Sequence, residues 1–179
     1  MPLTAEVIQA APDDEALLAL LSAELNRLLP RGVLRDRELY LRVFDTLPPG
    51  LRAMAGMHFF DVSMAIDDLA WHFGNQFDEG AISATLNGLK ELELYEVADL
   101  FEQARRLMNP YIETRQKDQP IDMDATEWSE RNGVDEHIRA MDRRIREIGK
   151  NLGKSGLMTQ WPIYARKYPE RCVVADQPS

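Results

Sequence analysis

Residues 58–75 read HFFDVSMAIDDLAWHFGN, an apolar run that carries several polar and charged side chains. At about 100° per residue, a helix places four of them in one stripe less than about 90° wide. Apolar residues flank this stripe on both sides, which is typical of a largely buried central helix. The stretch therefore predicts a central helix from about residue 51 to residue 73, whose polar stripe consists of His58, Asp61, Asp68 and His72.

Three interpretations of the stripe stay open: a hydrogen-bonded seam, a groove that faces a partner or ligand, and a metal site. A buried polar group without a partner costs about 1–3 kcal/mol, which favours the seam. Either pair one turn apart, His58 with Asp61 or Asp68 with His72, is spaced to share a ligand. His58 and His72 would lie about 21 Å apart along one helix, so a single ion cannot bind both.

The rest of the chain predicts an all-α fold, a single globular domain of about six to seven helices. Apolar periodicity, with proline and glycine at the ends, places the other helices in residues 12–32, 36–47, 78–92, 94–110, 134–152 and 155–170. Residues 111–133 are acidic and poorly periodic, and predict a long loop with at most one short turn. The expected organisation is an N-terminal helical extension (1–50), a helical core (51–172) and a flexible tail (173–179).

Composition limits the class of protein. A 179-residue chain with 45% hydrophobic residues can bury a substantial core. The N-terminus lacks the pattern of a signal peptide, and no apolar run approaches the roughly 20 residues of a membrane span. A cytoplasmic protein is therefore expected. Cys172 is the only cysteine, which excludes an intramolecular disulfide and a cysteine-based zinc cluster within one chain.

The net charge of −9 is unevenly distributed. Residues 78–136 contain 15 acidic and 6 basic residues, whereas residues 137–179 contain 4 acidic and 9 basic residues. An acidic surface repels phosphate and attracts basic proteins, so the sequence predicts a basic protein partner and no direct contact with nucleic acid. Ordinary solubility is the competing explanation. The candidate partner-binding residues are Glu91, Glu93, Glu96, Asp99, Glu102, Asp122 and Asp124.

A basic helix follows the acidic region and contains Arg139, Arg143, Arg144 and Arg146. We interpret it as an internal partner of residues 78–136 or as a contact between subunits. The sequence contains none of the common motifs for hydrolases, zinc peptidases, redox dithiols or EF-hands, and no cofactor is predicted.

Three segments taken together resemble a bacterial family of helical domains of unknown function that includes a DNA-mimic protein: AIDDLAWHFGNQFDEGAISATLNGLKELELYEVADLFEQARRLM, MDRRI and YARKYPERC. The resemblance covers roughly residues 58–172. The family's Asn-Gly-Gly-Phe turn is replaced here by WHFGNQF, in which Gly74, Asn75 and Phe77 are the nearest equivalents. The resemblance implies an all-helical, commonly dimeric fold without known catalysis. In the DNA-mimic member, surface carboxylates occupy the DNA-binding face of a transcription factor.

The predicted function is that of a non-enzymatic acidic protein that binds a basic protein, either a DNA-binding protein by DNA mimicry or a toxin as an immunity protein would. One alternative is a metal- or small-molecule-dependent enzyme that uses the stripe. The other is a structural homodimer in which the basic helix meets the acidic region of a second copy.

Overall fold

A computed structural model of the chain describes residues 3–30, 37–117 and 119–174. Within these ranges the chain forms helices and no strand, so the prediction of an all-α fold is confirmed. The helices outnumber the six to seven predicted, because two expected helices are interrupted and short helices occupy stretches predicted to be irregular. The α-helices are α1 (Ala5–Ala10), α2 (Asp14–Leu28), α4 (Arg37–Thr46), α5 (Pro49–Ile66), α6 (Leu69–Asn75), α7 (Glu79–Glu91), α8 (Tyr95–Gln116), α9 (Ala125–Arg131), α10 (Asp135–Leu152) and α11 (Gln160–Lys167), and the 3-10 helices are η1 (Gly156–Thr159) and η2 (Pro169–Arg171).

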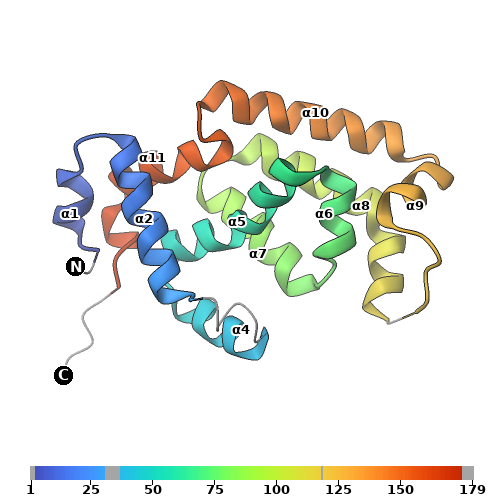
Figure 1. Cartoon of the computed structure of the whole chain (residues 1–179), viewed down its shortest axis with the longest axis horizontal. Coiled ribbons are helices and arrows are strands. Elements are labelled where there is room, and N and C mark those ends of the chain that lie inside the picture. The colour runs from blue at the N-terminus through green and yellow to red at the C-terminus, as the bar shows by residue number, and fades with distance from the viewer. Residues whose placement is uncertain (1–2, 31–36, 118, 175–179) are drawn as a thin grey trace.

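Helix α5 lies at the centre of the fold (Figure 1). It packs antiparallel against α7 at unusually short distance, because two glycines leave room for the facing backbone. A Cβ atom on Gly56 would lie 2.5 Å from the carbonyl oxygen of Ala84, and one on Gly88 would lie 2.5 Å from that of Ala53. Thr85 Oγ1 also donates a hydrogen bond of 3.1 Å to the carbonyl of Gly56. The two helices therefore form one rigid unit.

The predicted helix over residues 51–73 is wrong as one element, because the chain breaks between α5 and α6. Asp68 is extended, and its side chain caps α6 by accepting a hydrogen bond of 2.8 Å from the backbone N–H of Trp71. Helix α10 stabilises both sides of the break. Arg146 donates to the carbonyl oxygens of Met64 and Asp67, and Asp142 accepts from the backbone N–H of Leu69. The same two side chains pair with each other at 2.7 Å.

The predicted end of a helix at Pro110 is also wrong, and the predicted loop over 111–133 is wrong for residues 111–116 and 125–131, which are helical. Helix α8 continues through Pro110 to Gln116. An internal proline costs about 3 kcal/mol, but here the following turn buries Tyr111 and Ile112. The Tyr111 ring packs against Trp128 of α9, with 5.8 Å between ring centroids. Packing of this turn outweighs the local preference of proline.

The N-terminal helices α1 and α2 lie beside the C-terminal helix α11 at one end of the molecule, away from α9 (Figure 1). Arg166 of α11 donates to the carbonyl of Ala11 and pairs with Asp14 at 3.0 Å. Buried residues from α1 to Cys172 belong to one hydrophobic cluster. Of the predicted flexible tail, residues 175–179 lie outside the described residues. No helix in the described ranges is long and apolar enough to cross a membrane.

Candidate protein-binding surface

The four residues of the predicted stripe do not share a site. Asp68 lies at the N-terminus of α6, and His72 is fully buried in that helix. His58 and Asp61 lie on α5, where the His58 ring packs against Trp161. Burial raises the pKa of Asp61 to about 6. Among the described residues, no group of three or more His, Cys, Asp or Glu side chains is placed to hold a metal ion.

His72 belongs to a buried polar seam inside an aromatic cluster. Ser63 Oγ donates to the carbonyl of Phe59, so it accepts a hydrogen bond of 2.9 Å from His72 Nδ1–H. The imidazole packs edge-on against Phe60 and Phe101, at 5.3 and 5.6 Å between ring centroids. Burial lowers the pKa of His72 to about 3, so the ring is neutral at physiological pH.

The carboxylates of residues 91–102 mostly pair with cations of the same chain. Glu96 pairs with Arg144 of α10 at 2.7 Å, and Glu93 pairs with Lys167 of α11 at 2.7 Å. Two further pairs follow the same pattern, namely Glu91–Arg171 at 2.7 Å and Glu102–Arg106 at 3.1 Å. Outside this segment, Arg139 of the basic helix pairs with Glu130 at 3.2 Å. The prediction that the basic helix is an internal partner of the acidic region is confirmed for Arg139 and Arg144. Asp99 is exposed and makes no ion pair with the described residues.

A second group of carboxylates surrounds α9, and we call it the α9 corner: Asp122, Asp124, Glu127, Glu130, Asp135 and Glu136. Arg131 pairs with Glu127, while Arg139 reaches both Glu130 and Asp135. Six carboxylates thus share two cations, which leaves an excess of four negative charges. Asp122 and Glu136 are exposed and make no ion pair within the described ranges. Asp124 is exposed too, and its side chain caps α9 through the backbone N–H of Glu127.

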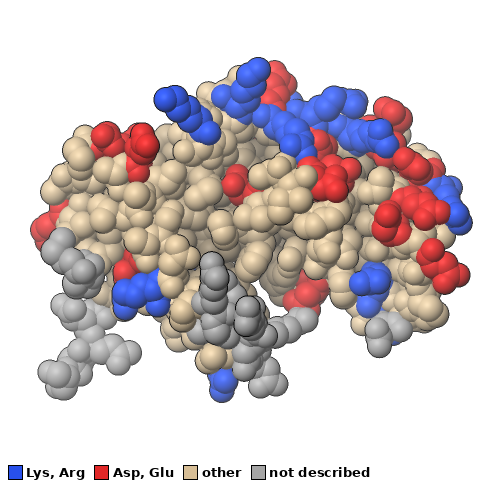
Figure 2. All heavy atoms as spheres, viewed as in Figure 1, with Lys and Arg blue, Asp and Glu red and all other residues tan. Residues whose placement is uncertain are grey.

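Charge is separated across the surface. Figure 2 shows basic side chains gathered along the edge that α10 forms, and acidic side chains gathered toward the end of the molecule that carries α9. Packing of α9 against α8 positions the α9 corner. Trp128 of α9 packs on Tyr111 of α8, and Ala125 and Ser129 of α9 are buried. The acidic side chains of α9 consequently stand on the outer face of a docked helix.

The candidate residues chosen from the sequence include Asp122 and Asp124 of this corner, but not Glu127, Glu130, Asp135 and Glu136. The signal is present in the segment TEWSERNGVDE, which contains four acidic residues and one basic residue. Its weak periodicity led to a loop prediction. The short helix α9 begins at Ala125 and is capped by Asp124, and the motif D-x-x-E, formed by Asp124 and Glu127, is the sign of this start in the sequence.

A family model described as DMP19-like protein matches residues 45–167, which is 123 of the 179 residues. DMP19 is a DNA-mimic protein, so this match confirms the resemblance found in the sequence. Comparisons with curated proteins and with solved structures return no match. The chain therefore belongs to the DMP19-like protein family.

Proposed function

We propose that this protein binds a basic protein partner through the α9 corner, and that the carboxylates there stand in for the phosphates of DNA. The observation that carries the proposal is the excess of four negative charges at the corner. Uncompensated charge on a rigid surface steers an oppositely charged partner and contributes to binding, whereas a charge already paired within the chain contributes little.

The family supports the choice of partner. A DNA-binding protein presents arginine and lysine side chains arranged to contact phosphates. An acidic helix fixed to a folded body meets the same side chains with less ordering cost than a flexible acidic tail. The proposed action is therefore competitive: the chain occupies the face of the partner that otherwise contacts DNA, and no catalytic step is involved.

The test compares two triple variants that each remove three negative charges. The corner variant carries Asp122→Asn, Glu127→Gln and Glu136→Gln, and the matched control carries Glu93→Gln, Glu96→Gln and Glu102→Gln. Each immobilised protein is exposed to lysate of the source organism at low salt and eluted with a salt step. We expect one basic protein to bind the wild type and the control, and to be lost with the corner variant.

The captured protein is then purified and its binding to labelled duplex DNA is measured with increasing amounts of the chain. Competition with DNA is the expected result, and the affinity between the two proteins should fall steeply as salt is added. Equal loss of capture with both triple variants would show that only bulk charge matters. A captured protein whose DNA binding is unaffected would contradict DNA mimicry.

A further inference from the structure

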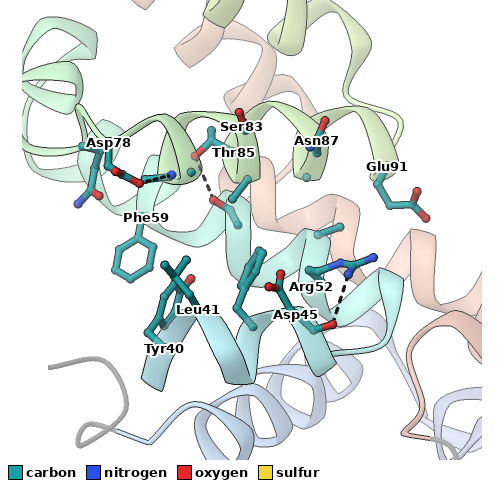
Figure 3. A pocket seen from close by; sticks show the side chains of 18 of the residues that line it. Tyr40, Leu41, Asp45, Arg52, Phe59, Asp78, Ser83, Thr85, Asn87 and Glu91 are labelled. Atoms are coloured by element: carbon teal, nitrogen blue, oxygen red, sulfur yellow. Dashed lines mark hydrogen bonds between the residues drawn. The ribbon is translucent and has the colours of Figure 1, made fainter. Parts of the chain in front are cut away.

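A groove on a different part of the molecule has no role in the proposed function. It runs between α4 and α7 with α5 as its floor, and its cavity volume is about 1040 Å³ (Figure 3). Small-molecule sites typically enclose about 300–1,000 Å³, so this groove is large enough for a ligand of that class. Because α4 and α5 are joined by a short connection, one end lies beside Asp45 and Arg52, which we call the Arg52 end. The other end lies beside Tyr40 and Phe59.

Aromatic side chains cover the wall and floor toward the second end. The Tyr40 ring lies 5.6 Å from the Phe44 ring and 6.0 Å from the Phe59 ring, measured between centroids. Leu41 and Phe59 remain 39% and 36% exposed, although both line the cavity. An apolar body that enters the groove would remove these surfaces from water, which is favourable in proportion to the area buried.

The Arg52 end carries two cations, Arg52 and Lys90, that form no ion pair with the described residues. Arg52 donates only to the backbone carbonyl of Asp45, at 3.5 Å, and Lys90 makes no ion pair in the described ranges. The third cation at this end, Arg171, is already paired with Glu91. The side chain of Asp45 also lines the groove, so the charge outside ion pairs sums to about one positive unit. Asp78 lies at the opposite end, where it caps α7.

We infer that this groove binds a small amphiphile with an apolar body and a single carboxylate head. Arg52 and Lys90 hold the carboxylate, and the body lies over Phe44, Phe59 and Tyr40. A guanidinium fork matches the geometry of a carboxylate, and a head with one negative charge complements the single excess positive charge.

Two ligands with the same body and opposite heads test the inference. Isothermal titration calorimetry of the full chain, below the micelle concentrations, compares dodecanoate with dodecylammonium. Binding through bulk charge alone would favour dodecylammonium, because the chain carries a net charge of −9. We expect the opposite: one dodecanoate bound per chain, with at least about tenfold preference over dodecylammonium.

Substitutions locate the site. Arg52→Gln and Lys90→Gln should each weaken dodecanoate binding about tenfold, since each removes a charge-assisted contact. Asp45→Asn should strengthen it, because a repelling carboxylate is removed. Arg143→Gln is the matched control, since Arg143 is an exposed cation of α10 that does not line the groove. Circular dichroism of each variant verifies folding.

Three results would overturn the inference. The first is tighter binding of dodecylammonium than of dodecanoate. The second is an equal effect of Arg52→Gln and Arg143→Gln. The third is a change of molecular mass in solution on Phe59→Asp substitution or on addition of dodecanoate, because the groove would then be occupied by a second copy of the chain. None of these measurements depends on the α9 corner.

Discussion

The 91–102 segment and the α9 corner have similar densities of acidic residues, but their carboxylates have different environments. Along residues 91–102, four of five carboxylates pair with cations, three of which come from the last third of the chain. At the α9 corner, six carboxylates share two cations. Acidic residues of the first region connect helices, whereas those of the second leave charge on the surface.

Two segments with similar acidic content therefore differ in how many of their carboxylates are paired, so charge density in a sequence does not identify a binding surface. Glu96 and Arg144 are 48 residues apart, and Glu93 and Lys167 are 74 residues apart, so local composition contains no sign of either pair. An ion pair within the fold leaves its carboxylate less available to an outside cation.

Acid should destabilise the protein most strongly through His72 in the interior, and less through Glu93, whose pKa is lowered by its hydrogen bond with Lys167. The pKa of His72 is lowered to about 3 in the folded state, while the unfolded chain binds this proton near pH 6.5. The unfolded state therefore binds more protons between these values, and stability is lost as pH falls from 6.5 toward 3. The full contribution is about 4–5 kcal/mol. Urea titrations at several pH values should show this slope, partly offset below about pH 6 by Asp61, because its raised pKa makes the folded state bind that proton first.

His72→Asn provides the comparison, because an asparagine amide can still donate to Ser63 and does not titrate. The variant should be less stable at pH 7, since part of the aromatic cluster becomes a cavity, but its stability should vary less between pH 6.5 and 4. An unchanged pH slope in the variant would assign acid sensitivity to the surface carboxylates.

Asp142→Asn examines a carboxylate that is paired and nearly buried. The substitution weakens the pair with Arg146 and leaves the guanidinium at the α5–α6 break without its counter-charge. Because Arg146 is 44% exposed, water partly replaces the lost partner, and we expect a loss of about 1–2 kcal/mol in the free energy of unfolding, measured in urea at pH 7. A loss below about 0.5 kcal/mol would mean that backbone carbonyls alone hold Arg146.

Glu91→Gln examines the most connected carboxylate of the 91–102 segment. Glu91 accepts from the Tyr164 hydroxyl and pairs with Arg171, and burial together with this contact raises the pKa of Tyr164. The amide keeps one hydrogen bond and loses the charge, so we expect a loss of about 1–2 kcal/mol in thermal unfolding experiments. Partner binding should be unchanged. Reduced binding would extend the partner surface to this segment.

Asp122→Asn should have the smallest effect on stability, within about 0.5 kcal/mol, because the exposed carboxylate makes no ion pair with the described residues. A stability change above 1 kcal/mol would show that this side chain has a structural role. The same variant should weaken capture of the basic partner, which separates function from stability at this position.

Helix periodicity predicted the fold class and the positions of most helices, because those signals are local. The break before Asp68 was not predictable, because the sequence does not distinguish an aspartate within the polar stripe of a continuous helix from one that caps a new helix. The group that stabilises the break, Arg146, comes from α10. The helix end predicted at Pro110 was wrong for a related reason, because the packing of Tyr111 against α9 favours continuation of α8 and comes from a distant part of the chain.

The candidate surface was predictable in part. The charge count located the acidic third of the chain and the basic helix that follows it. It could not separate Glu93 and Glu96, which pair within the fold, from Asp122, which does not. That separation depends on which helices pack together, and therefore on the whole hydrophobic core.

The contacts of Arg146 also bear on the order of events during synthesis. The backbone carbonyl of Asp67 is bound by a side chain 79 residues further along the chain. When α5 and α6 emerge from the ribosome, the backbone carbonyls at the break between them can form hydrogen bonds only with water. The break reaches its final geometry only after α10 has been translated and docked, so this part of the core is completed late in synthesis.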